Sequence, residues 1–208
     1  MGMCNSMYDV PLEWYSSRRH NQQNSADVLG DFQIEIIQKT WPTFSQHRQA
    51  VDTGCKIFMH MFANSPEIKN SFSFRSLTGD ELYQNSVFRA HSANFMTLIN
   101  DVVTNIYRLD ETALNRLIPL GAKHGLINAF HPSYLKEFKK SVLYTWENVL
   151  GHSYTSEIHE AWSGLFEFMI NNVANGYEAY ELEKSRTGGE GPHDEIVVPI
   201  RMIEEYTR

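Results

Sequence analysis

Residues 114–125 read LNRLIPLGAKHG, and Leu114, Leu117 and Leu120 recur at intervals of three on the helix face that also carries His124. This spacing predicts an amphipathic helix with a buried apolar face. A second apolar stripe precedes it, with spacings of three and four: Phe88, His91, Phe95, Ile99, Val102 and Ile106. One histidine on such a stripe is usually a satisfied core residue. Two of them, His91 and His124, on separate helices could instead hold a flat cofactor from both sides.

The rest of the chain is also predicted to be helical. Asp31 is a candidate N-cap, and the stripe after it consists of Phe32, Ile34, Ile37, Trp41 and Phe44. Ser65-Pro66-Glu67 is typical of a helix start, with a capping serine and a proline at the first helical position. The one strand-like run, residues 196–200, is interrupted by Pro199 between polar flanks. The fold class predicted from these patterns is all-α.

The 208 residues divide into one domain with two extensions. Residues 1–30 are polar and poorly periodic, and are predicted to be a flexible lead. Residues 31–180 form the predicted domain, and the charged, glycine-containing residues 181–208 are predicted to be a disordered tail.

Composition excludes several functions. The net charge of −7 argues against nucleic acid as a partner, and no run is apolar enough to be a transmembrane helix. Cys4 and Cys55 are too few for a disulfide framework, which favours a reduced intracellular setting. No nucleophile–base set, phosphate-binding glycine loop or zinc-type cysteine cluster occurs. Any catalysis would therefore come from a cofactor.

Haem suits the histidine pair, because its iron takes an imidazole on one face and leaves the other face open or takes a second ligand. The segment Leu120-Gly121-Ala122-Lys123-His124 resembles the proximal motif of the globin family, including Pro119 just before it. Ser65-Pro66 followed by Phe72 resembles the globin turn whose phenylalanine packs on the haem. Further similarities are Trp41 and Ala161-Trp162. The resemblance runs from Asp31 to Tyr177 and implies a globin fold around haem b.

The resemblance also implies a role for each matching residue. His124 would be the proximal iron ligand, with its second ring nitrogen donating to a backbone carbonyl, and His91 would occupy the distal position. Phe72 would pack on the haem, and Phe58 and Phe95 would line its distal side. Five residues would line the proximal side: Leu117, Leu120, Phe130, Tyr134 and Phe138.

The distal residues distinguish between kinds of globin. His91 is the only obvious hydrogen-bond donor, and Phe58 and Phe95 stand where oxygen-storing globins often carry smaller side chains. In such a crowded apolar environment the imidazole of His91 is expected to coordinate the iron, as in hexacoordinate, neuroglobin-like globins. The alternative is a pentacoordinate iron that binds oxygen or nitric oxide reversibly, with His91 donating a hydrogen bond to the ligand. His60, on the same predicted helix as Phe58, is expected to face away.

The N-terminus, Met1-Gly2-Met3-Cys4-Asn5-Ser6, fits the pattern for N-myristoylation at Gly2. One acyl chain anchors a protein only marginally, so palmitoylation of Cys4 is the expected second signal. The N-terminus resembles those of acylated nematode globins.

These features predict a globin tethered to the cytoplasmic face of the plasma membrane. Its expected role is redox signalling, electron transfer or oxygen and oxidant sensing. The expected partners are oxygen, nitric oxide, carbon monoxide and an electron donor or acceptor. A haem-free helical scaffold is the third possibility, and the two histidines argue against it.

Overall fold

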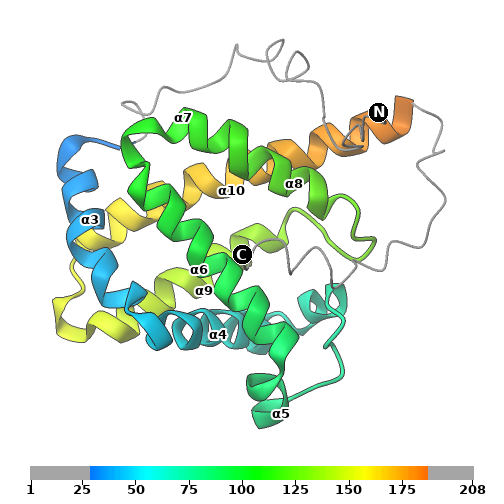
Figure 1. The fold of residues 1–208 in the computed structure, drawn as a ribbon, viewed down its shortest axis with the longest axis horizontal. Coiled ribbons are helices and arrows are strands. Elements are labelled where there is room, and N and C mark those ends of the chain that lie inside the picture. The colour runs from blue at the N-terminus through cyan, green and yellow to red at the C-terminus, as the bar shows by residue number, and fades with distance from the viewer. Residues whose placement is uncertain (1–28, 187–208) are drawn as a thin grey trace, which may run out of the picture.

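Helices make up all the regular structure in residues 29–186, the part of the chain that the computed structural model describes (Figure 1). The α-helices are α3 (Asp31–Ser45), α4 (His47–Asn64), α5 (Gly79–Gln84), α6 (Ser86–Thr104), α7 (Leu109–Thr112), α8 (Ile118–His124), α9 (Tyr134–Leu150) and α10 (Ser156–Arg186). Short 3-10 turns occupy Pro66–Ser71, Ile106–Arg108 and Gly151–Ser153, and a π-helical segment covers Ala113–Leu117. The predicted all-α class is confirmed, since no strand occurs in this range.

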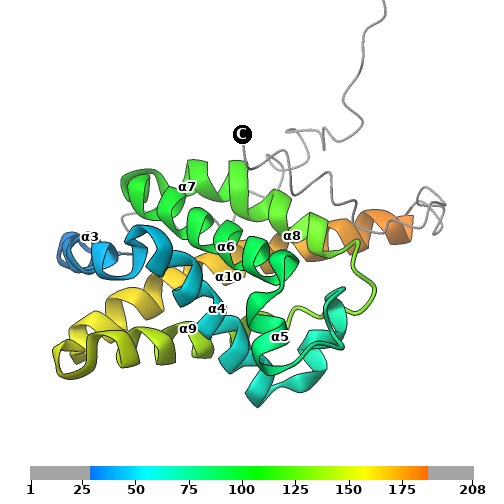
Figure 2. The same cartoon turned by 60° about the horizontal axis from the view of Figure 1, so that its bottom comes forward.

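The long helix α10 organises the molecule. It packs against α3, α8 and α9, while α4 packs against α6 and α9. Figure 2 shows α7 and α8 on one side of α10 and α9 on the other. The helices that carry the two candidate ligands, α6 and α8, are joined through α7 and the π-helical segment.

The main core is aromatic. The rings of Phe44 and Trp146 stack with centroids 4.1 Å apart and planes 8° apart, and Trp162 meets both edge-on. The stripe predicted for α3 is buried at four of its five positions, but Phe32 is 65% exposed. The prediction for Phe32 was wrong. Phe32 precedes Ile34 by two residues, a separation that turns the helix by about 200° and places Phe32 on the opposite face.

A second cluster of buried residues lies between α4, the 66–77 turn and the start of α6: Cys55, Phe58, Met61, Phe62, Ile68, Phe74, Leu82 and Phe88. Helix α4 comes very close to α6 here, since a Cβ atom at Gly54 would lie 2.7 Å from the carbonyl oxygen of Ser92. The Asn85 side chain accepts a hydrogen bond from the Phe88 amide at 3.0 Å and caps α6. These contacts fix the helix that bears His91.

Helix α10 continues past residue 180, the expected end of the domain, to Arg186. Ion pairs one turn apart support this last segment, with Lys184 3.4 Å from Glu181 and Arg186 3.6 Å from Glu183. The predicted lead, apart from its last two residues, and the rest of the predicted tail lie outside the described residues. Of the helices in residues 29–186, none combines the length and the apolar character that crossing a membrane requires.

Candidate haem site

The imidazole of His91 lies between two phenylalanine rings. Its centroid is 4.9 Å from that of Phe58 on α4 and 5.1 Å from that of Phe72 after the 66–71 turn, both in edge-on geometry. Neither ring nitrogen has a hydrogen-bond partner among the described residues. Phe58, Phe72 and His91, which the sequence predicted at one site, lie together in the structure.

His124 is the last residue of α8, and its orientation is fixed by its own helix. Its Nδ1 lies 2.8 Å from the carbonyl oxygen of Leu120, one turn earlier. A carbonyl can only accept, so Nδ1 carries the proton and Nε2 keeps a free lone pair. The Phe130 ring packs beside the imidazole at 4.7 Å. This is the backbone contact expected for a proximal ligand, and it leaves Nε2 able to bind a metal.

Both candidate ligands are neutral at physiological pH. Burial among apolar side chains lowers the pKa of His91 to about 4, and the nearby His124 lowers it further. Burial also lowers the pKa of His124, although its bond to the Leu120 carbonyl opposes this shift. A neutral imidazole is the form that binds iron.

Aromatic side chains extend from both histidines. Phe95 lies 5.9 Å from Phe58, and Phe138 on α9 lies 5.4 Å from Phe58 and 4.6 Å from Phe95. Phe138 therefore packs with Phe58 and Phe95, although the resemblance to globins predicted a place on the proximal side of a haem. The reason is that α9 passes α4 closely, which the sequence pattern does not reveal.

The other expected proximal residues differ in what they can contact. Phe130 packs on His124, and the Tyr134 ring lies 6.1 Å from that of Phe130. Leu120 is partly buried, but Leu117 is 0% exposed and belongs to the main core. In this structure the Leu117 side chain packs within the main core, one residue before α8 begins.

Tyr177 on α10 is a neighbour of the site that sequence reasoning missed. Its ring lies 5.6 Å from that of Phe130, which in turn packs on His124. A signal was available, because Tyr177 continues the apolar stripe of α10 four residues beyond Val173.

The remaining histidine on α4 faces away from this site, as expected. His60 Nδ1 lies 3.0 Å from Ser141 Oγ, and its ring stacks on Tyr144 of α9 at 3.9 Å. Cys55 is fully buried, and burial raises the pKa of its thiol, as expected for a core residue.

The residues fit haem better than a bare metal ion. Within residues 29–186 no group of three or more histidine, cysteine or acidic side chains is placed to hold a metal. Two imidazoles with apolar surroundings suit an iron whose other four ligands come from a porphyrin. The two histidines that resemble globin iron ligands in the sequence are therefore chemically suited to bind haem iron.

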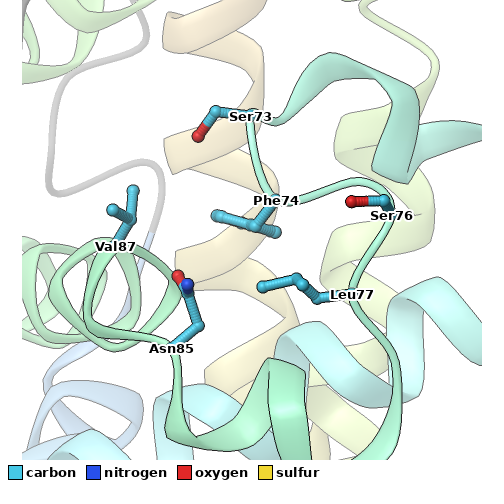
Figure 3. Close-up of a pocket in the computed structure, with 6 residues that line it drawn as sticks. All are labelled: Ser73, Phe74, Ser76, Leu77, Asn85 and Val87. Carbon is cyan, nitrogen blue, oxygen red and sulfur yellow. The ribbon is translucent and has the colours of Figure 1, made fainter.

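A small cavity of about 170 Å³ lies elsewhere, beside the loop before α5 and the start of α6 (Figure 3). Its lining residues are Ser73, Phe74, Ser76, Leu77, Asn85 and Val87. Neither candidate ligand contributes to it, and ligand pockets usually exceed about 300 Å³. We assign it no part in cofactor binding.

An all-α fold that carries two neutral imidazoles on separate helices fits a helical haem protein. The family model described as Globin matches residues 55–173, which include both candidate ligands. The chain therefore belongs to the globin family, and its fold is the globin fold.

Known proteins agree with this assignment. The chain is 27% identical to Cytoglobin-2 of Oryzias latipes over 154 residues, covering 73% of this chain and 84% of the relative. It is 24% identical to Neuroglobin of Danio rerio over 152 residues, covering 72% of this chain and 93% of the relative. A solved structure of a hexacoordinated heme protein from an anhydrobiotic tardigrade superposes with a TM-score of 0.66 at 20% identity, covering 72% of this chain and 96% of that one.

Proposed function

We propose that this haem-binding globin holds haem b between His124 as proximal ligand and His91 as distal ligand, and acts in redox chemistry at a membrane. The observation that carries the proposal is the environment of His91. Its ring contacts the edges of Phe58 and Phe72 and has no hydrogen-bond partner among the described residues. No side chain within residues 29–186 engages the nitrogens of this half-buried ring, so they stay available to coordinate iron.

Two imidazole ligands favour particular haem chemistry. If His91 and His124 both held its iron, haem would supply a one-electron redox couple. Phe58 and Phe95 keep the distal side apolar and crowded, which disfavours open access for a diatomic ligand. The proposed role is therefore electron transfer, redox signalling, or sensing of oxygen and oxidants. Oxygen, nitric oxide and carbon monoxide would compete with His91 for the iron.

A second function is reversible binding of oxygen or nitric oxide by pentacoordinate haem. The same residue favours it, because a neutral His91 carries one N–H that could donate to a bound ligand. The two proposals differ in whether His91 occupies the sixth position before any ligand arrives.

Location at the cytoplasmic face of the plasma membrane completes the proposal. Its support is the N-terminal sequence, where Gly2 fits a myristoylation pattern and Cys4 could carry a palmitoyl chain. Both residues lie outside the described range.

Absorption spectroscopy of the reduced, oxygen-free holoprotein tests the ligation. We expect sharply split low-spin bands in the parent protein and a high-spin spectrum in His91→Leu. His60→Leu is the matched control, because that histidine packs on α9 and should leave the spectrum unchanged. A high-spin spectrum in the parent would contradict bis-histidine ligation and favour the reversible binding function.

A further inference from the structure

Helices α8 and α10 meet through their backbones at two glycines. A Cβ atom at Gly121 would lie 1.9 Å from the carbonyl oxygen of Val173, and one at Gly176 would lie 2.0 Å from that of Ile118. The atoms in the way are backbone atoms, so no side-chain rotation could make room. Packed helices are usually kept about 8–10 Å apart by their side chains. Here only glycine allows the observed approach.

A third glycine extends this contact to the end of α8. A Cβ atom at Gly125 would lie 2.3 Å from the Cδ1 atom of Tyr180. Gly121 lies in α8 and Gly125 is its C-cap, whereas Gly176 lies on α10 opposite Ile118, the first residue of α8. Both ribbon views show α8 lying along α10 (Figures 1 and 2). We call this set, Gly121, Gly125 and Gly176, the glycine contact.

The chain that leads into α8 is irregular. A π-helical segment, Ala113–Leu117, precedes it, and Pro119 lies in its first turn without a backbone N–H to donate. The backbone hydrogen bonds change here from the π-helical to the α-helical pattern, with the Ile118 amide donating to the Ala113 carbonyl. Beyond this change of pattern, α8 packs extensively against α10.

His124 moves with α8 as one body. It is the last residue of the helix, and its Nδ1 is bound to the Leu120 carbonyl within the same helix at 2.8 Å. An added methyl group at Gly176 would have to increase a 2.0 Å separation to at least 3.0 Å. Such a shift of α8 would carry the imidazole with it.

We infer that the glycine contact positions His124 for axial ligation, so that Gly121 and Gly176 are positioning residues of the haem site. This inference rests on the proposed ligation by His124. Helix α10 carries no candidate ligand. Under this inference its packing against α8 sets the position of the His124 imidazole relative to α6.

The test compares Gly176→Ala in two backgrounds of the full-length holoprotein. In the parent protein we expect haem to be lost to a haem-free acceptor protein faster by roughly 10- to 100-fold. In His124→Gly supplied with free imidazole, the ligand is no longer tied to α8, and Gly176→Ala should change the rate by less than about threefold. Gly30→Ala, whose Cβ would meet nothing closer than 4.0 Å, is the control.

An equal effect of Gly176→Ala in both backgrounds would show a general packing role and overturn the inference. No effect in either background would overturn it too. If His124→Gly without imidazole kept the parent spectrum, the proposed ligation itself would fail.

Gly125→Ala keeps the inference testable if Gly176→Ala does not fold. Gly125 has a right-handed helical backbone that accepts alanine, and the obstacle is the movable ring of Tyr180. We expect a smaller increase in haem loss for Gly125→Ala, reversed in the double variant with Tyr180→Ala. A Gly125→Ala protein without increased haem loss, or a double variant that does not recover, would overturn the inference.

Discussion

The Phe58 ring meets the imidazole of His91 edge-on, with centroids 4.9 Å apart and planes at 63°. Aromatic pairs of this kind contribute about 0.5–1.5 kcal/mol beyond burial. Phe58→Leu should therefore weaken the hold on His91 and open the distal side. We expect carbon monoxide to bind the reduced protein about 2- to 10-fold faster, as measured by stopped-flow absorption.

Phe62→Leu is the control for that experiment. Phe62 belongs to the same aromatic cluster and lies 6.2 Å from Phe58, but it has no ring contact with His91. It should leave the binding rate close to that of the parent. Equal acceleration by both substitutions would mean that the cluster as a whole, and not the pair with His91, limits ligand entry.

The Phe44–Trp146 stack predicts a position where substitution strongly lowers the free energy of unfolding. Trp146 is fully buried, and its ring also meets Trp162 edge-on at 5.6 Å. Trp146→Ala should lower the free energy of unfolding by about 3–5 kcal/mol in denaturant titrations. Phe32→Ala, at a 65% exposed position, should change it by less than about 0.5 kcal/mol. Comparable losses from the two substitutions would contradict the assigned core.

His60 predicts a pH dependence of stability. Burial lowers the pKa of its imidazole below the ordinary value of 6.5. The Asn64 amide lies 3.2 Å from Nε2 and Ser141 Oγ lies 3.0 Å from Nδ1, an arrangement that suits the neutral ring. Between the folded and unfolded pKa values the unfolded chain holds more protons. This part of the stability is therefore complete above pH 6.5 and decreases as the pH falls below it.

His60→Gln removes that titration. Between about pH 7.5 and pH 5.5, the unfolding free energy of the holoprotein should fall more steeply in the parent than in the variant. Denaturant titrations at intervals of about half a pH unit measure this difference. Parallel curves would show that His60 does not contribute to the pH dependence.

Gly2→Ala tests the proposed membrane anchor. Alanine at position 2 cannot accept a myristoyl chain, so the variant should move from the membrane to the soluble fraction of acylation-competent cells. Cys4→Ser should retain the first acyl chain and give only partial, reversible association. The anchor proposal fails if the parent protein and Gly2→Ala are both found in the soluble fraction.

Much of this protein could be predicted from local patterns. The stripes bearing His91 and His124 predicted two helices, because burial of one face imposes a period of 3.6 residues on the sequence. The π-helical pattern of Ala113–Leu117, within the second predicted helix, was not predicted. The side of α4 on which His60 lies followed from the same periodicity. The all-α class and the approach of Phe58 and Phe72 to His91 agree with what the sequence predicted.

Only the tertiary structure decided which helices approach one another. It placed Phe138 with Phe58 and Phe95, buried Leu117 entirely in the core, and extended α10 to Arg186. It also brought Gly121 against Val173 and Gly176 against Ile118, pairs more than 50 residues apart in the chain. Periodicity records that a face is buried but not what covers it, because many apolar partners lower the free energy equally well. The sequence determined the helices and placed a histidine on each of two of them, and the tertiary structure brought α8 against α10.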